Sequence, residues 1–237
     1  MAFTHIQGTS ASFAVSELSQ AITLGAAPGN GHLVCYGIII TYTGGSITSL
    51  SITDGNNNSY AVTPNSPAPL TTQGGGTTGA TYLAYLLPAP ANADATITAT
   101  WTGTTGTSGV QVFADEFSFT GHCIFDVDAE ATSTVASTTI TTPSITPTYG
   151  AGELLYSVAG STGSITAPAA GATRGIWTGC GGGISNGDDA EYVLSSAAGA
   201  SAVNYLQSSN GWAAMAMAFY NPTATSVYQR MPVMFLG

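Results

Sequence analysis

Two short motifs in the sequence contain residue types that catalytic or nucleotide-binding sites use. Gly183-Ile184-Ser185-Asn186-Gly187 matches the Gly-x-Ser-x-Gly pattern of a nucleophilic serine. That pattern needs a strand before it, a helix after it and a later histidine, but all three histidines of the chain precede Ser185. Residues 74–79 match the Gly-x-Gly-x-x-Gly phosphate-binding pattern, but no helical sequence follows them. We therefore predict loops at both motifs, with no catalytic serine and no nucleotide cofactor.

Acidic residues offer a second kind of chemistry, because carboxylates coordinate Ca²⁺. Asp126, Asp128 and Glu130 alternate, so a regular strand would project all three to one side. They are either oxygen ligands for Ca²⁺ or a solvated acidic edge that deters strand pairing, and we favour the edge. Asp54-Gly55-Asn56-Asn57-Asn58 also offers oxygen atoms, but it lacks the acid that closes an EF-type loop. A hairpin turn is the favoured interpretation of that segment.

Glu116 is the acid whose surroundings are hardest to explain. Strict alternation places it on the same face as Val110, Val112 and Ala114. Either a bulge at Asp115-Glu116 resets the register, or the carboxylate points inward and must accept hydrogen bonds from backbone N–H or hydroxyl groups. Glycosidase chemistry would require a second acid beside Glu116 in a cleft, and the sequence does not place one.

Cysteine and histidine do not form a recognisable metal site. Cys35, Cys123 and Cys180 are odd in number and show no Cys-x-x-Cys spacing, which argues against a zinc module or a disulfide framework. His32 and Cys35 are three residues apart and would face opposite sides of a strand. We expect no bound metal and three reduced, mostly buried thiols.

The charge content excludes several classes of partner. Only 6% of the 237 residues are charged, and Arg174 and Arg230 are the only Lys or Arg residues beside 12 acids. Phosphate neutralisation needs several basic side chains, so nucleic-acid binding and a polybasic membrane site are not expected. No apolar run approaches the roughly 18 residues of a membrane helix, and the first residues show no signal-peptide core.

The elements that must position these residues are predicted to be strands. Residues 94–102 alternate between an apolar face and a threonine face, which indicates a half-buried strand. Residues 32–43, 82–87, 154–159 and 212–220 are apolar on both faces, as in strands that are covered on both sides. Turn residues separate these runs and no sustained helical stripe occurs. The fold class is predicted to be all-β, an antiparallel, jelly-roll-like β-sandwich.

A weak internal repeat divides the chain into two related halves. Gly31-His32-Leu33 leads into one strand, and Gly152-Glu153-Leu154 leads into another. Each repeat follows a Thr/Ser-rich strand, and each half closes with an aromatic strand. We predict halves of about residues 1–121 and 122–221 that share one sandwich, with two tandem small sandwiches as the alternative.

These motifs resemble a duplicated β-sandwich domain family that is found in bacterial surface proteins and phage structural proteins. The similarity is carried by residues 31–34, 54–60, 114–118, 151–154 and 212–219. The resemblance implies a structural or binding module without established enzymatic activity. The missing leader peptide favours a phage particle.

Residues 222–237 differ from the rest of the chain. A polar stretch is followed by a strongly apolar segment that contains Tyr228, Met231, Met234 and Phe235. Such a segment either packs on its own domain or forms an arm that docks into a neighbouring subunit. We treat these four residues as candidate assembly contacts.

The sequence as a whole favours a non-enzymatic structural protein of the phage virion, either a capsid decoration protein or a tail surface protein. Its partners would be copies of itself and other virion proteins. The alternative is a carbohydrate- or cell-surface-binding module that contacts a host glycan. Its aromatic platform would come from an exposed Trp101, Trp177, Trp212 or a loop tyrosine, and Trp177 is the best candidate because it precedes a glycine-rich loop.

Overall fold

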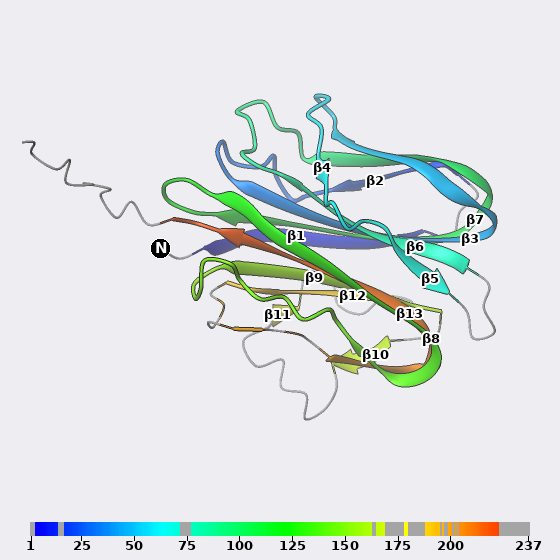
Figure 1. Ribbon diagram of the computed structural model, residues 1–237. Coiled ribbons are helices and arrows are strands. Elements are labelled where there is room, and N and C mark those ends of the chain that lie inside the picture. The colour runs from blue at the N-terminus through cyan, green and yellow to red at the C-terminus, as the bar shows by residue number, and fades with distance from the viewer. Residues whose placement is uncertain are drawn as a thin grey trace, which may run out of the picture.

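The computed structural model describes residues 3–13, 17–71, 77–162, 165–168, 178–179, 188–194, 196, 199–200, 202 and 204–222. All regular elements in these residues are β-strands arranged in two antiparallel sheets, which confirms the predicted all-β sandwich (Figure 1). Within the same residues, no helix is long and apolar enough to span a membrane.

The first sheet contains the strands of the N-terminal half. They are β1 (Thr4–Phe13), β2 (Ser19–Thr23), β3 (Leu33–Asp54), β4 (Ala61–Val62), β5 (Ala68–Thr71), β6 (Thr77–Leu86) and β7 (Thr96–Ser118). The strand order is β1-β7-β3-β6-β4, and β2 also pairs with β7 while β5 pairs with β6. The two longest strands, β3 and β7, therefore lie at the centre of the sheet.

The second sheet contains the strands of the C-terminal half. They are β8 (Ile124–Thr141), β9 (Leu154–Ser161), β10 (Ile165–Pro168), β11 (Thr178–Gly179), β12 (Asp188–Val193) and β13 (Asn204–Tyr220). The strand order is β10-β13-β9-β12-β11, and β8 pairs with β13.

The two sheets pack face to face through a shared apolar cluster (Figure 1). Leu33, Phe113 and Phe117 contribute to it from the first sheet, and Met215 and Phe219 contribute from the second. A separate cluster covers the other face of each sheet. Both faces of the central strands are therefore buried, as their continuous apolar sequences predicted.

In the first half, β3 and β7 curve back over themselves. Their inner parts are residues 33–41 of β3 and 109–117 of β7, and their outer parts are residues 49–54 of β3 and 96–102 of β7. The outer parts cover the inner parts. Tyr36 and Ile38 from the inner part of β3 share a cluster with Ile52, Ile97 and Trp101 from the outer parts. The alternation predicted for residues 94–102 is confirmed, because the apolar positions from 97 to 101 are buried and the threonines between and beside them are at least partly exposed.

The two halves have the same connectivity. In each half the last strand, β7 or β13, pairs with the first strand on one side and with the strand after the Gly-x-Leu repeat on the other. Leu33 lies opposite Phe117 in the first half, and Leu154 lies opposite Phe219 in the second. The repeat seen in the sequence thus occupies equivalent positions in the two sheets.

The turns that enter the repeats are also equivalent. Ala89 exchanges two backbone hydrogen bonds of 2.8 Å with Gly31 and the residue after it. Ser196 exchanges the same pair with Gly152 and the residue after it, at 2.9 and 2.8 Å. Gly31 and Gly152 have φ angles of 81° and 96°, a left-handed conformation that favours glycine. This shared requirement explains why glycine is kept at this position of both halves.

Among the described strands, β8 pairs with β13 alone. On this strand Ser133 Oγ accepts the Val135 N–H and donates to the Val135 carbonyl, both at 3.2 Å. Ser137 makes the same two bonds with Thr139, at 3.1 and 2.7 Å. Backbone groups at two positions of β8 are therefore bonded to serine side chains of their own strand.

Candidate functional site

Glu116, for which the sequence left two orientations open, points into the interior. It is 1% exposed, and the pairing of β7 with β3 shows no register shift around it. The bulge that we considered at Asp115-Glu116 lies instead in the neighbouring strand β1, between His5 and Gln7. The alternative with an inward carboxylate is therefore correct.

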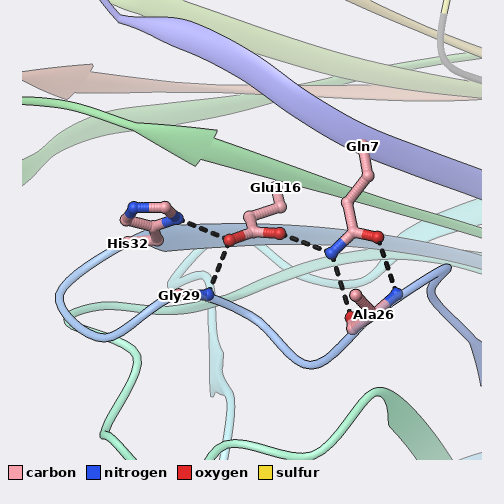
Figure 2. A network of polar contacts seen from close by, with 5 residues as sticks. All are labelled: Gln7, Ala26, Gly29, His32 and Glu116. Carbon is pink, nitrogen blue, oxygen red and sulfur yellow. Dashed lines mark hydrogen bonds and ion pairs between the residues drawn. The ribbon is translucent and has the colours of Figure 1, made fainter.

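The Glu116 carboxylate is satisfied by a network of donors from β1 and from the loop before β3 (Figure 2). Oε1 accepts the Gly29 N–H at 2.7 Å and lies 2.5 Å from Nδ1 of His32. Oε2 accepts Nε2 of Gln7 at 2.5 Å. The Gln7 amide also bonds to both the N–H and the carbonyl of Ala26, each at 3.0 Å. The network connects the loop to β7. Of its three direct donors, only a backbone N–H was anticipated from the sequence; Gln7 was not named there, and His32 was not paired with Glu116.

Asp115 points to the opposite face of β7, toward the second sheet. Its carboxylate is fully buried; Oδ1 lies 2.8 Å from Nε2 of His5, and Oδ2 accepts the hydroxyl of Tyr156 at 3.0 Å. The His5 ring stacks on Tyr192, with centroids 4.7 Å apart and an interplanar angle of 18°. Tyr156 and Tyr192 belong to β9 and β12, so this group joins the two halves.

Gly8 leaves the space that Asp115 occupies. A Cβ atom at this position would lie 2.1 Å from Oδ1 of Asp115 and 3.2 Å from Nε2 of His5. Any larger residue would push the carboxylate away from its imidazole partner. The glycine in β1 is therefore required for the close contact between His5 and Asp115.

The β7 strand thus carries two histidine–carboxylate pairs, His5–Asp115 and His32–Glu116. A carboxylate that orients an imidazole is one component of a nucleophilic relay, which also requires a serine, threonine or cysteine at the imidazole. In the part of the chain that the structure describes, neither ring is hydrogen-bonded to such a side chain. Asp115 connects β7 to β1 and β9, and Glu116 connects β7 to β1 and to the loop before β3.

The three alternating acids do not converge. Asp126 is the bulged residue of β8, because Phe125 and Val127 pair with consecutive residues of β13. This bulge breaks the alternation on which the shared-face prediction depended, and that prediction is wrong for Asp126.

The partners of these acids also differ. Asp128 is 6% exposed and accepts the Asn65 N–H at 2.8 Å, which joins β8 to the first half, whereas Glu130 is exposed. Among the described residues, no group of three or more His, Cys, Asp or Glu side chains is placed to hold a metal ion.

Asp54 forms the hairpin turn that the sequence favoured. Its Oδ1 accepts the N–H groups of Asn56 and Asn58, both at 2.9 Å. Its Oδ2 accepts Nδ2 of Asn58 at 2.8 Å and the Asp94 N–H at 2.9 Å. Burial acts to raise the pKa of Asp54, but these hydrogen bonds outweigh it and the pKa is lowered. The acceptor capacity of this carboxylate is therefore used by three donors of its own turn and by the Asp94 N–H.

A pair of acids holds the turn at the start of the second repeat. Thr148 N–H donates to Oδ2 of Asp126 at 2.8 Å, and Tyr149 N–H donates to Oε1 of Glu153 at 3.0 Å. Glu153 is fully buried, and burial together with the nearby Asp126 raises its pKa to about 7. Tyr149 itself is 54% exposed, and its ring stacks on Tyr220.

A shallow pocket of about 210 Å³ lies at the bend of β3. Its lining combines apolar and hydroxyl side chains: Ile47, Thr48, Ser49, Leu50, Val62, Pro67 and Tyr82. No carboxylate, imidazole or thiol lines it, so it does not bring together groups for acid–base chemistry.

Two of the tryptophans considered as sugar platforms are interior residues. Trp101 is 0% and Trp212 is 8% exposed, so neither supplies the exposed platform that the carbohydrate-binding alternative requires. Trp177 and the assembly candidates Tyr228, Met231, Met234 and Phe235 lie outside the described residues, as do Cys180 and the Ser185 motif. Cys35 and Cys123 are free and buried, as predicted.

The residues that sequence reasoning missed are His5, Gln7 and Tyr156. The signal that was available is an adjacent pair of acids inside an apolar strand of a chain that almost lacks Lys and Arg. Buried carboxylates need donors, so the histidines and amides were the remaining partners to search.

Comparison with known proteins adds no relative to this description. No protein-family model matches the chain, and a search of curated proteins found no significant match.

Proposed function

We propose that this chain is a non-enzymatic structural protein of a phage virion, a capsid decoration or tail surface protein that acts through protein–protein contacts. The observation that carries the proposal is a solvent-facing sheet surface without charge. It is formed by β2, the outer part of β7 and the outer part of β3, which pair side by side. We call it the hydroxyl face.

The hydroxyl face consists almost entirely of serine and threonine. Its side chains, all at least partly exposed, are Ser19, Ala21, Thr23, Ser49, Ser51, Thr53, Thr96, Thr98, Thr100 and Thr102. Several hydroxyl groups bond across the strands. Oγ of Ser19 lies 3.0 Å from Oγ1 of Thr100, and Oγ of Ser49 lies 2.7 Å from Oγ1 of Thr102.

Such a face suits contact with another protein. This face contains no Lys, Glu or Asp, whose charged groups are costly to remove from water. Hydroxyl groups that already bond to each other lose less on removal from water than isolated ones. Serine and threonine side chains are also short, so few rotatable groups are immobilised on binding.

The proposal is tested with Thr100→Lys, which places a charge at the centre of the hydroxyl face. We expect the wild-type protein to sediment with phage particles or to form oligomers in light scattering, and Thr100→Lys to lower the association constant at least about tenfold, or about 1.4 kcal/mol. Thr138→Lys, at an exposed position of β8, is the matched control and should bind normally. A wild-type protein that stays monomeric and does not bind to particles would overturn the proposal.

A further inference from the structure

The most exposed aromatic side chain in the described residues is Tyr149, and it is held in a defined position. Its ring is stacked on Tyr220, the last residue of β13, with centroids 4.3 Å apart and an interplanar angle of 11°. Since one face rests on Tyr220 and the side chain is still 54% exposed, the other face of the ring is open to solvent.

The backbone under this ring is fixed by two carboxylates. Asp126 accepts the N–H of Thr148 at 2.8 Å, and the buried Glu153 accepts the N–H of Tyr149 at 3.0 Å. A ligand that stacks on Tyr149 would therefore meet a preorganised surface and pay little for ordering the loop. Tyrosine offers a rigid, amphipathic contact at low entropic cost.

The carboxylate of Asp126 is the nearest polar group that the hydrogen bonds of this turn identify. It is partly exposed, it accepts the N–H of Thr148, the residue before Tyr149, and it is also hydrogen-bonded to the Glu153 side chain. About two of the four acceptor sites of a carboxylate are then left for a hydroxyl donor of a ligand. An open aromatic face with a polar group next to it in the fold is the combination that small-ligand sites use to give contact area and orientation.

We propose that Tyr149, supported by Tyr220 and Asp126, is a binding site for a neutral carbohydrate. The C–H groups on one face of a sugar ring carry partial positive charge and pack on the electron-rich face of tyrosine, while a sugar hydroxyl donates to Asp126. An anionic sugar would be repelled by Asp126 and by the net charge of −10. A protein partner would require roughly 800 Å² of surface per side, far more than one tyrosine ring offers. The inference does not depend on the proposed virion role.

The test uses the full chain on a printed array of neutral glycans and titrates maltohexaose, cellohexaose and chitohexaose by calorimetry. We expect the wild-type protein to retain at least one neutral glycan. Tyr149→Ala should weaken that binding about tenfold or more, and Tyr149→Phe should keep it within about threefold. Asp126→Asn should also weaken it. Val135→Ala, at a 71% exposed position of β8, is the control that should bind normally.

Three outcomes would overturn the inference. The first is a wild-type protein that retains no neutral glycan, and the second is glycan binding that persists in Tyr149→Ala. The third is an oligomer that Tyr149→Ala dissociates while no glycan binds, which would assign the ring to a protein interface. Assembly on particles is a separate readout, so failure of glycan binding and failure of the virion role are distinguishable.

Discussion

Asp115 and Glu116 are consecutive residues of β7 whose buried carboxylates lie on opposite faces of one sheet. Asp115 bonds to Tyr156 of the second half, and Glu116 bonds to the loop before β3. Each has a histidine partner. A single dipeptide therefore fixes both the packing of the two halves and the entrance to the first repeat.

Loss of the Glu116 carboxylate should destabilise the fold. Glu116→Ala removes the acceptor of the partly buried Gly29 N–H and one of the two acceptors of the Gln7 amide nitrogen. We expect the free energy of unfolding in urea to fall by about 3 kcal/mol. Glu130→Ala, which removes an exposed acid, should change it by less than about 0.5 kcal/mol. Equal effects of the two substitutions would contradict a structural role for the network.

Two fully buried tyrosines should respond differently to loss of the hydroxyl group. Tyr156→Phe removes the bond to Asp115 and should cost about 2 kcal/mol. The hydroxyl of Tyr36 is buried and has no hydrogen-bond partner in the described part of the protein, so Tyr36→Phe should be neutral or stabilising. Chemical denaturation of both variants provides the comparison. If Tyr36→Phe were destabilised while Tyr156→Phe kept the stability of the wild type, the hydrogen bonds assigned to these two hydroxyl groups would be wrong.

Glu153 should make stability depend on pH near neutrality. Its pKa is raised from 4.5 to about 7, so between these values the folded protein holds a proton that the unfolded chain has released. Its contribution is therefore complete below pH 4.5 and is lost as pH rises through about 7. Glu153→Gln, which imitates the protonated form, should gain in melting temperature relative to wild type between pH 5 and pH 8. A difference that stays constant over this range would argue against the shift.

Asp54 should make stability depend on pH in the opposite direction from Glu153. Its pKa is lowered from 3.8, so its contribution is present above that value and is lost as pH falls through the folded-state pKa. Asp54→Asn should therefore lower the melting temperature clearly at pH 7 and less at pH 2.5. If the deficit of the variant were as large in acid as at neutral pH, the carboxylate would not be the stabilising form.

The periodicity of the sequence predicted much of the fold. The alternation at residues 94–102 and the runs that are apolar on both faces correspond to the buried and exposed positions of β7, β3 and β13. The Gly-x-Leu repeat correctly predicted two related halves, because left-handed glycines and the leucines that follow them are required by the same turn in each sheet.

The partners of the acids could not be predicted in the same way. A period of two gives the face of a residue within its own strand, but not which side chain of a distant strand meets it. His5 is 110 residues from Asp115 in the sequence, and its position opposite β7 depends on a bulge in β1 between His5 and Gln7. The face of Asp126 was mispredicted for a different reason: one extra residue in its own strand breaks the period of two, and the sequence does not mark that bulge.

The serine bonds along β8 have a consequence for how copies of this protein can meet. An open strand edge recruits a strand from another chain only if its N–H and C=O groups are free to continue the ladder. At Val135 and Thr139 these groups are already engaged by Ser133 and Ser137. At these two positions β8 therefore offers fewer free backbone groups to a strand from another chain, without the help of lysine or proline, and we expect replacement of both serines with alanine to free these groups.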